Sequence, residues 1–152
     1  MPELKKAFEV HAKVDTPTVV GQDAVHGRRQ LIPILSGELI GEGLHGTILP
    51  GGVDSQVIRP NGICELSARY GIRLDDGSSF YIENNGIRTV PKECVETVLQ
   101  GGFIDPDLYY FCTKPEFEIY DERLQWLNER LFICCATRLP DAVILSYYTV
   151  EK

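Results

Sequence analysis

The strongest constraint on the fold is the alternation of apolar and polar side chains over residues 63–83, ICELSARYGIRLDDGSSFYIE. In the first part of this segment, apolar side chains occupy every second position and charged or hydroxyl-bearing side chains fill the positions between them. A period of two matches an extended strand, because successive side chains of a strand point to opposite faces of its sheet. The sequence therefore predicts two strands joined by a tight turn over residues 75–77.

The length of this turn decides which residues of the two strands face each other. A two-residue loop would place Arg73 opposite Phe80 and mix charged with apolar side chains on one face. A three-residue loop, with Gly77 in the left-handed conformation, gives two uniform faces and is the register we predict. It pairs Ile72 with Phe80, Tyr70 with Ile82 and Arg69 with Glu83. The polar face then carries Glu65, Ser67, Arg69, Arg73, Tyr81 and Glu83. Such a face is a solvated surface or, in a barrel wide enough to hold a ligand, the wall of a binding site.

Similar alternation recurs along the chain, so the protein is predicted to be mainly β. Further strand-like segments lie at residues 8–14, 28–34, 38–49, 108–118, 131–138 and 142–150. Turn signals at 60–62, 75–77 and 85–86 indicate a meander. Two short helices are expected, one over residues 91–101 and one after Asp121 with Leu124, Leu127 and Leu131 on its apolar side.

The chain shows no linker and no internal repeat, so residues 1–152 are expected to form one domain. The strand-like segments indicate about eight or more antiparallel strands. In one small domain, such strands must split into a sandwich or close into a barrel, and closure removes exposed strand edges.

Charge and hydropathy exclude several classes of partner. The chain carries 15 Lys and Arg against 22 Asp and Glu, a net charge of −7. It therefore offers no basic field for nucleic acid or for an anionic membrane surface. No apolar run approaches the roughly 18 residues that cross a bilayer, and the first ten residues lack an apolar signal segment. We expect a cytoplasmic protein with no nucleic-acid or membrane partner.

Sequence motifs give no indication of a metal or a cofactor. The five cysteines have no C-x-x-C spacing and the three histidines are scattered, so we predict core-filling thiols and no metal site. Residues 41–46, GEGLHG, match the G-x-G-x-x-G of dinucleotide sites, but an extended segment ending at Pro50 follows in place of the required helix. We therefore expect no cofactor. His45, in a polar loop, is the one histidine that could act as an acid or base.

The aromatic residues can serve either a core or a ligand cavity. Tyr109, Tyr110 and Phe111 are consecutive, and Trp126 is the single tryptophan. Large rings fill protein cores, and Tyr and Trp also line cavities where a rigid apolar plate carries one polar group. Both interpretations stay open on the sequence alone.

Five segments taken in order resemble one known family. They are HGTILPGGVDSQ (45–56), ELSARYGIRLDDG (65–77), NNGIR (84–88), YYFCTKPEFE (109–118) and WLNERLFI (126–133). Together they are similar to the domain of unknown function 3237 family, also called uncharacterised protein family 0311, over nearly the whole chain. The resemblance implies a single antiparallel β-barrel of calycin-like appearance that forms homo-oligomers, with an activity that has not been generally assigned.

The resemblance also carries the recurrent polar and aromatic positions of the family to this sequence. They fall on Gln56, Arg59, Arg69, Arg88, Thr113, Glu118, Trp126, Asn128 and Arg138. Two positions depart from the family pattern, because Ser55 stands where a tryptophan is expected and Ser67 stands where an acidic residue is common. If that acid is a general base in the family, Glu65 or Glu83 would have to replace it here.

Three functions are compatible with these residues. The first is the binding of a small anionic or carbonyl-bearing organic molecule in the lumen of the barrel, because a guanidinium recognises a carboxylate through two parallel hydrogen bonds. The side chains predicted to bind are Gln56, Arg59, Arg88, Tyr110, Thr113, Trp126, Asn128 and Arg138. The second is a cofactor-independent lyase or isomerase, in which Arg69 stabilises an oxyanion and Glu83 or Glu118 moves a proton. The third is a structural or interaction protein whose polar face is a subunit interface or a solvent surface.

Overall fold

The computed structural model describes all residues, 1–152, and consists mainly of β-strands. The strands are β1 (Glu3–Val14), β2 (Thr18–Asp23), β3 (Gly27–Gly41), β4 (Leu44–Ile48), β5 (Gly52–Ile58), β6 (Cys64–Leu74), β7 (Ser79–Thr89), β8 (Tyr110–Ile119), β9 (Phe132–Arg138) and β10 (Ala142–Glu151). The helical segments are short: η1 (Lys92–Cys94), α1 (Val95–Leu99), η2 (Pro106–Leu108) and η3 (Glu122–Asn128), where η denotes a 3₁₀ helix.

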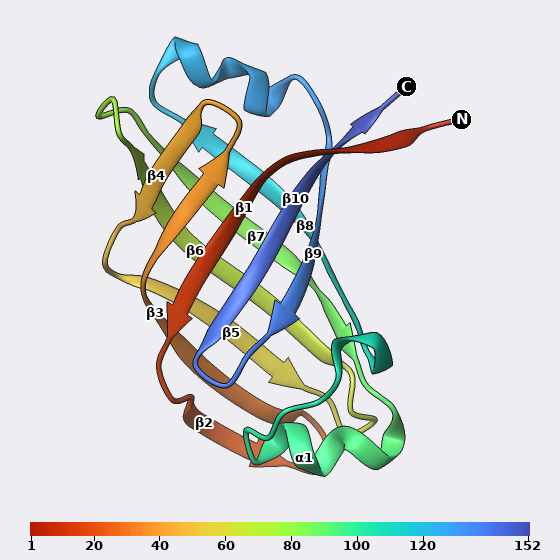
Figure 1. Cartoon of the computed structure of the whole chain (residues 1–152). Coiled ribbons are helices and arrows are strands. Elements are labelled where there is room, and N and C mark those ends of the chain that lie inside the picture. Colours follow the sequence, from red (N-terminus) through yellow and green to blue (C-terminus); the bar gives the residue numbers. More distant parts are fainter.

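Antiparallel pairing closes the strands into an eight-stranded barrel (Figure 1). The order around the barrel is β1, β10, β9, β8, β7, β6, then β4 and β5 in one shared position, then β3, which pairs with β1 again. β4 and β5 share a position because each pairs with both β3 and β6. β2 pairs only with β3 and lies outside the closed ring. The predicted antiparallel β-barrel with short helices is confirmed.

The turn between β6 and β7 sets the register that the sequence predicts. The paired residues are Ile72 and Phe80, Tyr70 and Ile82, and Arg69 and Glu83. The backbone N–H of Leu74 donates to the carbonyl oxygen of Ser78 at 2.8 Å, so three residues form the loop. Gly77 has a φ of 90°, a left-handed conformation that glycine adopts at little cost.

Three predictions about individual elements are wrong. Residues 85–86 form no turn and lie inside β7, where a Cβ on Gly86 would come within 2.3 Å of a backbone oxygen of β8. The segment 38–49 is two strands, because a turn at residues 42–43 separates β3 from β4. The second helix is a 3₁₀ segment, and Leu131 lies beyond it with 78% of its surface exposed. For Gly86, the neighbouring strand β8 decides a local conformation that the local sequence leaves open.

The interior of the barrel is packed at one end and hollow at the other. Aromatic rings fill the packed end: Phe8, Phe80, Phe117, Trp126, Phe132 and Tyr147. The segment η3 closes this end and buries Leu124 and Leu127 against it. The opposite end, next to α1 and β2 in Figure 1, contains the cavity described below. The structure thus places Trp126 with the packed aromatic core.

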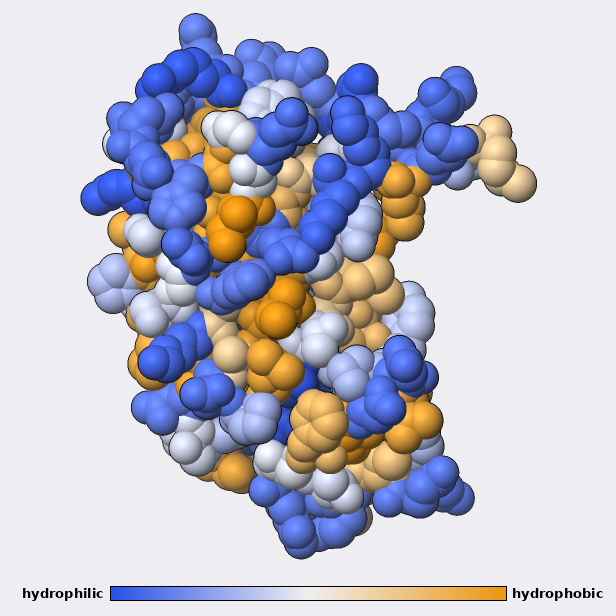
Figure 2. Space-filling model, viewed as in Figure 1, coloured by the Kyte–Doolittle hydropathy of each residue, from blue (hydrophilic) through white to orange (hydrophobic).

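The surface over the packed end is strongly hydrophilic. Figure 2 shows hydrophilic side chains gathered around the segment η3 at the top of the view. Arg123 in this segment forms ion pairs with Asp121 at 2.7 Å and with Asp76 of the β6–β7 turn at 3.1 Å. Such exposed pairs fix a local geometry while adding little to stability. No helix in the protein has the length and apolar composition needed to span a membrane.

Candidate functional site

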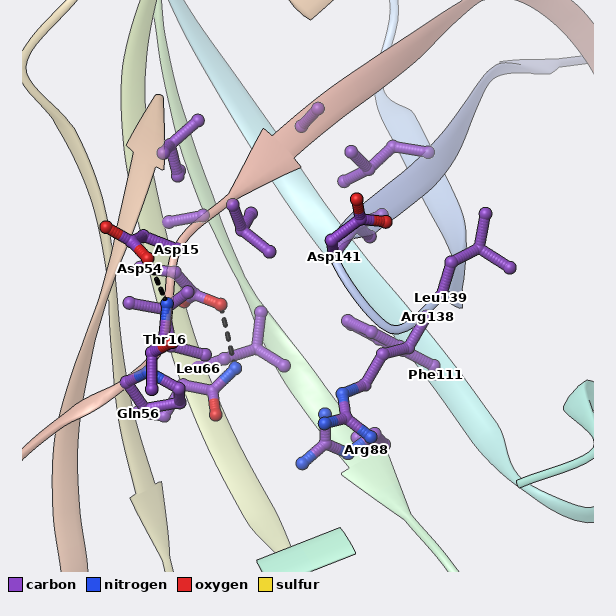
Figure 3. A pocket seen from close by; sticks show the side chains of 18 of the residues that line it. Asp15, Thr16, Asp54, Gln56, Leu66, Arg88, Phe111, Arg138, Leu139 and Asp141 are labelled. Carbon is purple, nitrogen blue, oxygen red and sulfur yellow. Dashed lines mark hydrogen bonds between the residues drawn. The ribbon is translucent and has the colours of Figure 1, made fainter. Parts of the chain in front are cut away.

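A cavity of about 370 Å³ occupies the hollow end of the barrel (Figure 3). Its wall is apolar along β1, β3, β6 and β10, where it is formed by Ala12, Ile32, Ile34, Leu66, Ala68, Val143 and Leu145. Its mouth is formed by residues 15–17, between β1 and β2, and by residues 139–141, between β9 and β10. This size falls within the range of small-molecule sites. We call this space the main cavity.

Two arginines project into the main cavity from the ends of β7 and β9, the strands on either side of β8. Arg88, near the end of β7, is 5% exposed, and its guanidinium carbon lies 5.7 Å from the ring centre of Phe111. Arg138, at the end of β9, donates from Nη1 to the carbonyl oxygen of Gly102 at 3.0 Å. Burial and the positive charge of Arg88 lower the pKa of Arg138. Figure 3 shows the two side chains side by side on the same wall.

The opposite wall carries a carboxyl group, Asp54 of β5, at the end of a chain of hydrogen bonds. Gln30 donates from Nε2 to Oε1 of Gln56 at 2.9 Å, and Gln56 donates from Nε2 to Oδ2 of Asp54 at 2.8 Å. The second oxygen of Asp54, Oδ1, is enclosed and has no hydrogen-bond partner. Burial raises the pKa of Asp54, while the bond from Gln56 and the charge of Arg88 act in the opposite direction.

Two tyrosine hydroxyls separate the main cavity from the aromatic core. Tyr70 of β6 and Tyr147 of β10 are hydrogen-bonded at 2.5 Å, and Asn84 donates to the Tyr147 oxygen at 3.4 Å. All three residues are buried. Burial raises the pKa values of both tyrosines, so the hydroxyls stay protonated at neutral pH. Of these three residues, Tyr70 and Asn84 line the main cavity and give the hollow end a polar floor.

Only some of the ligand-binding residues predicted from the sequence come together here. Gln56, Arg88 and Arg138 line the main cavity. Thr113 lies on the inner face of β8 and is buried, but it is not part of the cavity wall. The aromatic ring that lines the cavity from β8 is Phe111, the neighbour of the predicted Tyr110, which is 54% exposed.

The other predicted ligand-binding residues lie away from the lumen. Arg59 is on the surface, paired with Glu65. Trp126 packs edge-on against Phe8 at the far end of the barrel. Asn128 is exposed at the end of η3.

The predicted catalytic residues face outward. Arg69 and Glu83 form a surface ion pair with Nη2 and Oε1 3.2 Å apart, and more than a third of each side chain is exposed. Glu118 is exposed and accepts a hydrogen bond from Tyr120. The polar row on β6 and β7 is therefore the outer face of the barrel, and the structure brings none of these three side chains to the main cavity.

His45 lies in a surface cluster outside the barrel. Its Nε2 is 2.8 Å from Oε1 of Glu38, and its Nδ1 is 2.8 Å from Oδ2 of Asp75. The hydrogen bond to Glu38 and, to a smaller extent, the hydrogen bond to Asp75 raise the pKa of His45. The described side chains contain no group of three or more His, Cys, Asp or Glu that could hold a metal ion.

Asp54 is the main site residue that the sequence pattern does not reveal. Its strand, β5, has polar residues at two inward positions, Asp54 and Gln56, followed by the buried Ile58. An inward polar row runs against the usual rule that inward positions are apolar. Polar residues at inward positions would have indicated a site on this strand, had residues 52–58 been predicted as a strand.

Fold and cavity together define a class of protein: small antiparallel eight-stranded barrels with one packed end and a polar, arginine-bearing lumen at the other. The chain belongs to the family described as "Protein of unknown function (DUF3237)", whose sequence profile matches residues 2–150. The resemblance noted from the sequence motifs is thereby confirmed.

Known relatives support this assignment over the full length of the barrel. A UPF0311 protein of Clostridium acetobutylicum is 54% identical over 147 residues, which cover 97% of this chain and 93% of the relative. The crystal structure of a conserved protein of unknown function from Rhodopseudomonas palustris is 41% identical and has a TM-score of 0.91, covering 99% of this chain and 97% of the other. A beta-barrel like protein from Acinetobacter baumannii is 30% identical with a TM-score of 0.85, covering 99% and 97%.

Proposed function

We propose that the protein binds a small organic anion in the lumen of its barrel, with the anionic group on Arg88 and Arg138. The observation that carries the proposal is the state of Arg88, a buried guanidinium that faces the main cavity and has no carboxylate partner. Buried charges are normally paired, because an isolated ion loses its hydration without compensation. A bound carboxylate or enolate supplies the missing partner.

The surroundings of the two arginines favour an anion with an apolar body. A guanidinium presents parallel N–H groups that match both oxygens of a carboxylate. The apolar wall of the main cavity can cover a hydrocarbon portion, and a volume of about 370 Å³ suits a molecule of modest size. Since the chain has a net charge of −7, attraction of the anion is local to the lumen.

Calorimetric titration with 4-phenylbutyrate, a carboxylate with an apolar body, tests the proposal. We expect the wild-type protein to bind 4-phenylbutyrate and not to bind the neutral 4-phenylbutanol. Arg88→Gln should weaken binding roughly 10- to 100-fold, because it removes a charge-assisted contact. The matched control is Arg69→Gln, which removes an arginine from the adjacent strand on the outer face. Equal losses in both variants, or equal binding of acid and alcohol, would contradict the proposal.

A second candidate function is a cofactor-independent lyase or isomerase that acts on the bound anion. The observation in its favour is Asp54, whose pKa is raised by burial and whose carboxyl group borders the same cavity as Arg88. A carboxylate with a raised pKa is a stronger base, and a neighbouring guanidinium stabilises an enolate oxygen. In this function Asp54 removes a proton next to a carbonyl group and returns it to the same or another carbon.

Hydrogen–deuterium exchange provides the test of this second function. In D₂O, the wild-type protein should accelerate the loss of the C3 proton signal of 4-phenyl-2-oxobutanoate in NMR spectra. Asp54→Asn should reduce the exchange to the uncatalysed rate while the compound still binds. Glu83→Gln serves as the control on the outer face, and loss of exchange in that variant instead would favour the catalytic group predicted from the sequence.

A further inference from the structure

A side chamber of about 230 Å³ adjoins the main cavity and brings in a third arginine. The two spaces share Gln56, Arg88 and Arg138 in their walls, and Arg28 and Gln30 of β3 belong to the side chamber alone. Arg28 is half-buried and donates from Nη1 to the carbonyl oxygen of Leu99 at 3.2 Å. Its Nε donates to Oε1 of Gln22 at 3.2 Å. Both acceptors are neutral, so Arg28 also has no acidic partner.

The three chamber arginines differ from most of the arginines on the outside of the barrel. Arg28, Arg88 and Arg138 form no ion pair, whereas the surface arginines that do so are Arg59, Arg69, Arg123 and Arg130. Three unpaired positive charges therefore line one connected space in a protein of net charge −7. The energy cost of keeping like charges together in a partly dry interior is recovered when an anionic ligand fills the space.

We propose that the lumen binds a short dicarboxylate that carries an apolar substituent. One carboxylate contacts Arg88 and Arg138 where the two spaces meet, and the second contacts Arg28 and Gln30 in the side chamber. The substituent lies against the apolar wall of the main cavity. This proposal rests on the proposed function, since it assigns the class of anion that the same site takes.

Geometry favours two anionic groups near one end of the ligand over two at opposite ends. The arginines lie along the side chamber and its junction with the main cavity, and the rest of the main cavity is bordered mainly by apolar side chains. At the mouth, Asp15 and Asp141 are carboxylates that would repel a second anionic group placed there. A 1,2-dicarboxylate with a hydrocarbon branch satisfies both conditions.

Calorimetric titration with benzylsuccinate and 4-phenylbutyrate provides the test, because the second compound lacks one carboxylate of the first. We expect wild-type protein to bind benzylsuccinate at least tenfold more tightly than 4-phenylbutyrate. Arg28→Gln should bring this ratio close to one, because it should weaken the binding of benzylsuccinate far more than that of 4-phenylbutyrate. Arg28→Lys should give an intermediate ratio, since it keeps the charge and loses the paired N–H groups.

The matched control is Arg29→Gln, on the next residue of the same strand. Arg29 is exposed, donates to Oγ of Ser55 at 3.0 Å and does not line the side chamber, so this variant should keep the wild-type ratio. Thermal unfolding of all variants establishes that they are folded. Equal wild-type affinity for the two acids, or an equal loss of both in Arg28→Gln, overturns the dicarboxylate proposal alone. If neither acid binds, the dicarboxylate proposal and the proposed function are both overturned.

Discussion

The hydroxyl pair of Tyr70 and Tyr147 gives a test of how polar groups are satisfied inside the barrel. Removing the Tyr147 hydroxyl deprives both Tyr70 and Asn84 of a partner, whereas removing the Tyr70 hydroxyl leaves Tyr147 bonded to Asn84. Each buried polar group without a partner costs about 1–3 kcal/mol. We therefore expect Tyr147→Phe to lower the free energy of unfolding by about 2–3 kcal/mol and Tyr70→Phe by about 1 kcal/mol. Urea unfolding followed by circular dichroism measures both values, and equal losses in the two variants would show that the contact with Asn84 contributes nothing.

The buried carboxyl group of Asp54 should make the free energy of unfolding depend on pH, with lower stability at higher pH. Its folded-state pKa is raised from the ordinary 3.8, so the folded protein keeps a proton that the unfolded chain releases as the pH rises past that value. The stability that the protonated group contributes is complete below about pH 3.8 and is lost as the pH rises through the folded-state pKa. At neutral pH, the buried carboxylate thus lowers the free energy of unfolding.

Asp54→Asn should remove this penalty, because asparagine keeps an oxygen that can accept from Gln56 and has no charge to bury. We expect the variant to be more stable than wild type at pH 7, and the difference to vanish near pH 3. Urea unfolding of both proteins between pH 3 and pH 8 measures it. A difference that stays constant over this range would show that the ionisation of Asp54 is not coupled to folding.

At the scale of single elements, the contact between β8 and β9 is the shortest in the closed barrel. The two strands share only the pairs Cys112 with Cys135 and Thr113 with Cys134. The Sγ atoms of Cys112 and Cys135 lie 3.4 Å apart on the outer face. Directly opposed residues of antiparallel strands have Cα separations that a disulfide can span. The two thiols can therefore be joined with small side-chain rotations.

Oxidised glutathione should convert this pair to a disulfide with release of two molecules of reduced glutathione. We expect the bond to raise the free energy of unfolding by about 3 kcal/mol. Burial and the neighbouring Cys112 thiol raise the pKa of Cys135 to about 11, so the reaction should be slow at pH 7 and faster at pH 9. Thiol titration before and after treatment counts the loss of two thiols, and Cys112→Ser is the control that should show neither this loss nor the stabilisation.

The sequence predicted those elements whose pattern is local. The β6–β7 register follows from alternation and from Gly77, and both depend on residues close together in the chain. The turn expected at residues 85–86 failed because Gly86 is required by the close approach of β8, a strand that lies more than twenty residues further along the chain. β5 was not recognised because its inward positions carry Asp54 and Gln56.

The sequence predicted only part of the candidate site, because local patterns do not show which residues the closed barrel brings together. Gln56, Arg88 and Arg138 were identified through the family resemblance, and the structure brings them to one cavity. Arg69 and Glu83 were paired correctly but lie on the outer face. Alternation defines two faces of a strand, and the side that faces the lumen is fixed only when the barrel closes and the apolar face of β6 turns inward.

For the whole molecule, the division into a packed end and a hollow end separates stability from binding. The aromatic core beneath η3 contains no charged side chain among its packed rings, while the unpaired arginines lie at the other end. A buried arginine without an ionic partner, such as Arg88, reduces the stability of the empty protein. Ligand binding should therefore stabilise the folded protein. In the absence of ligand, the packed end keeps the barrel folded.

The distribution of charge over the whole molecule opposes the entry of an anion. The net charge is −7, and the exposed Asp15 and Asp141 both border the mouth, where the Val14 N–H donates to the Asp141 carbonyl oxygen. An anion that enters through this mouth passes both carboxylates before it reaches the arginines. Repulsion at an entrance lowers the association rate constant and leaves contacts in the bound state largely unchanged.

The double variant Asp15→Asn/Asp141→Asn should therefore bind benzylsuccinate with an association rate constant roughly two- to fivefold higher at low salt, and with a similar dissociation rate constant. At an ionic strength of about 0.5 M the two proteins should associate at nearly equal rates, because the screening length falls to only a few ångströms. NMR lineshape analysis of titrations at the two salt concentrations measures both rate constants. An unchanged association rate at low salt would mean that the anion enters by another route, and a changed dissociation rate would mean that the mouth carboxylates contact the bound ligand.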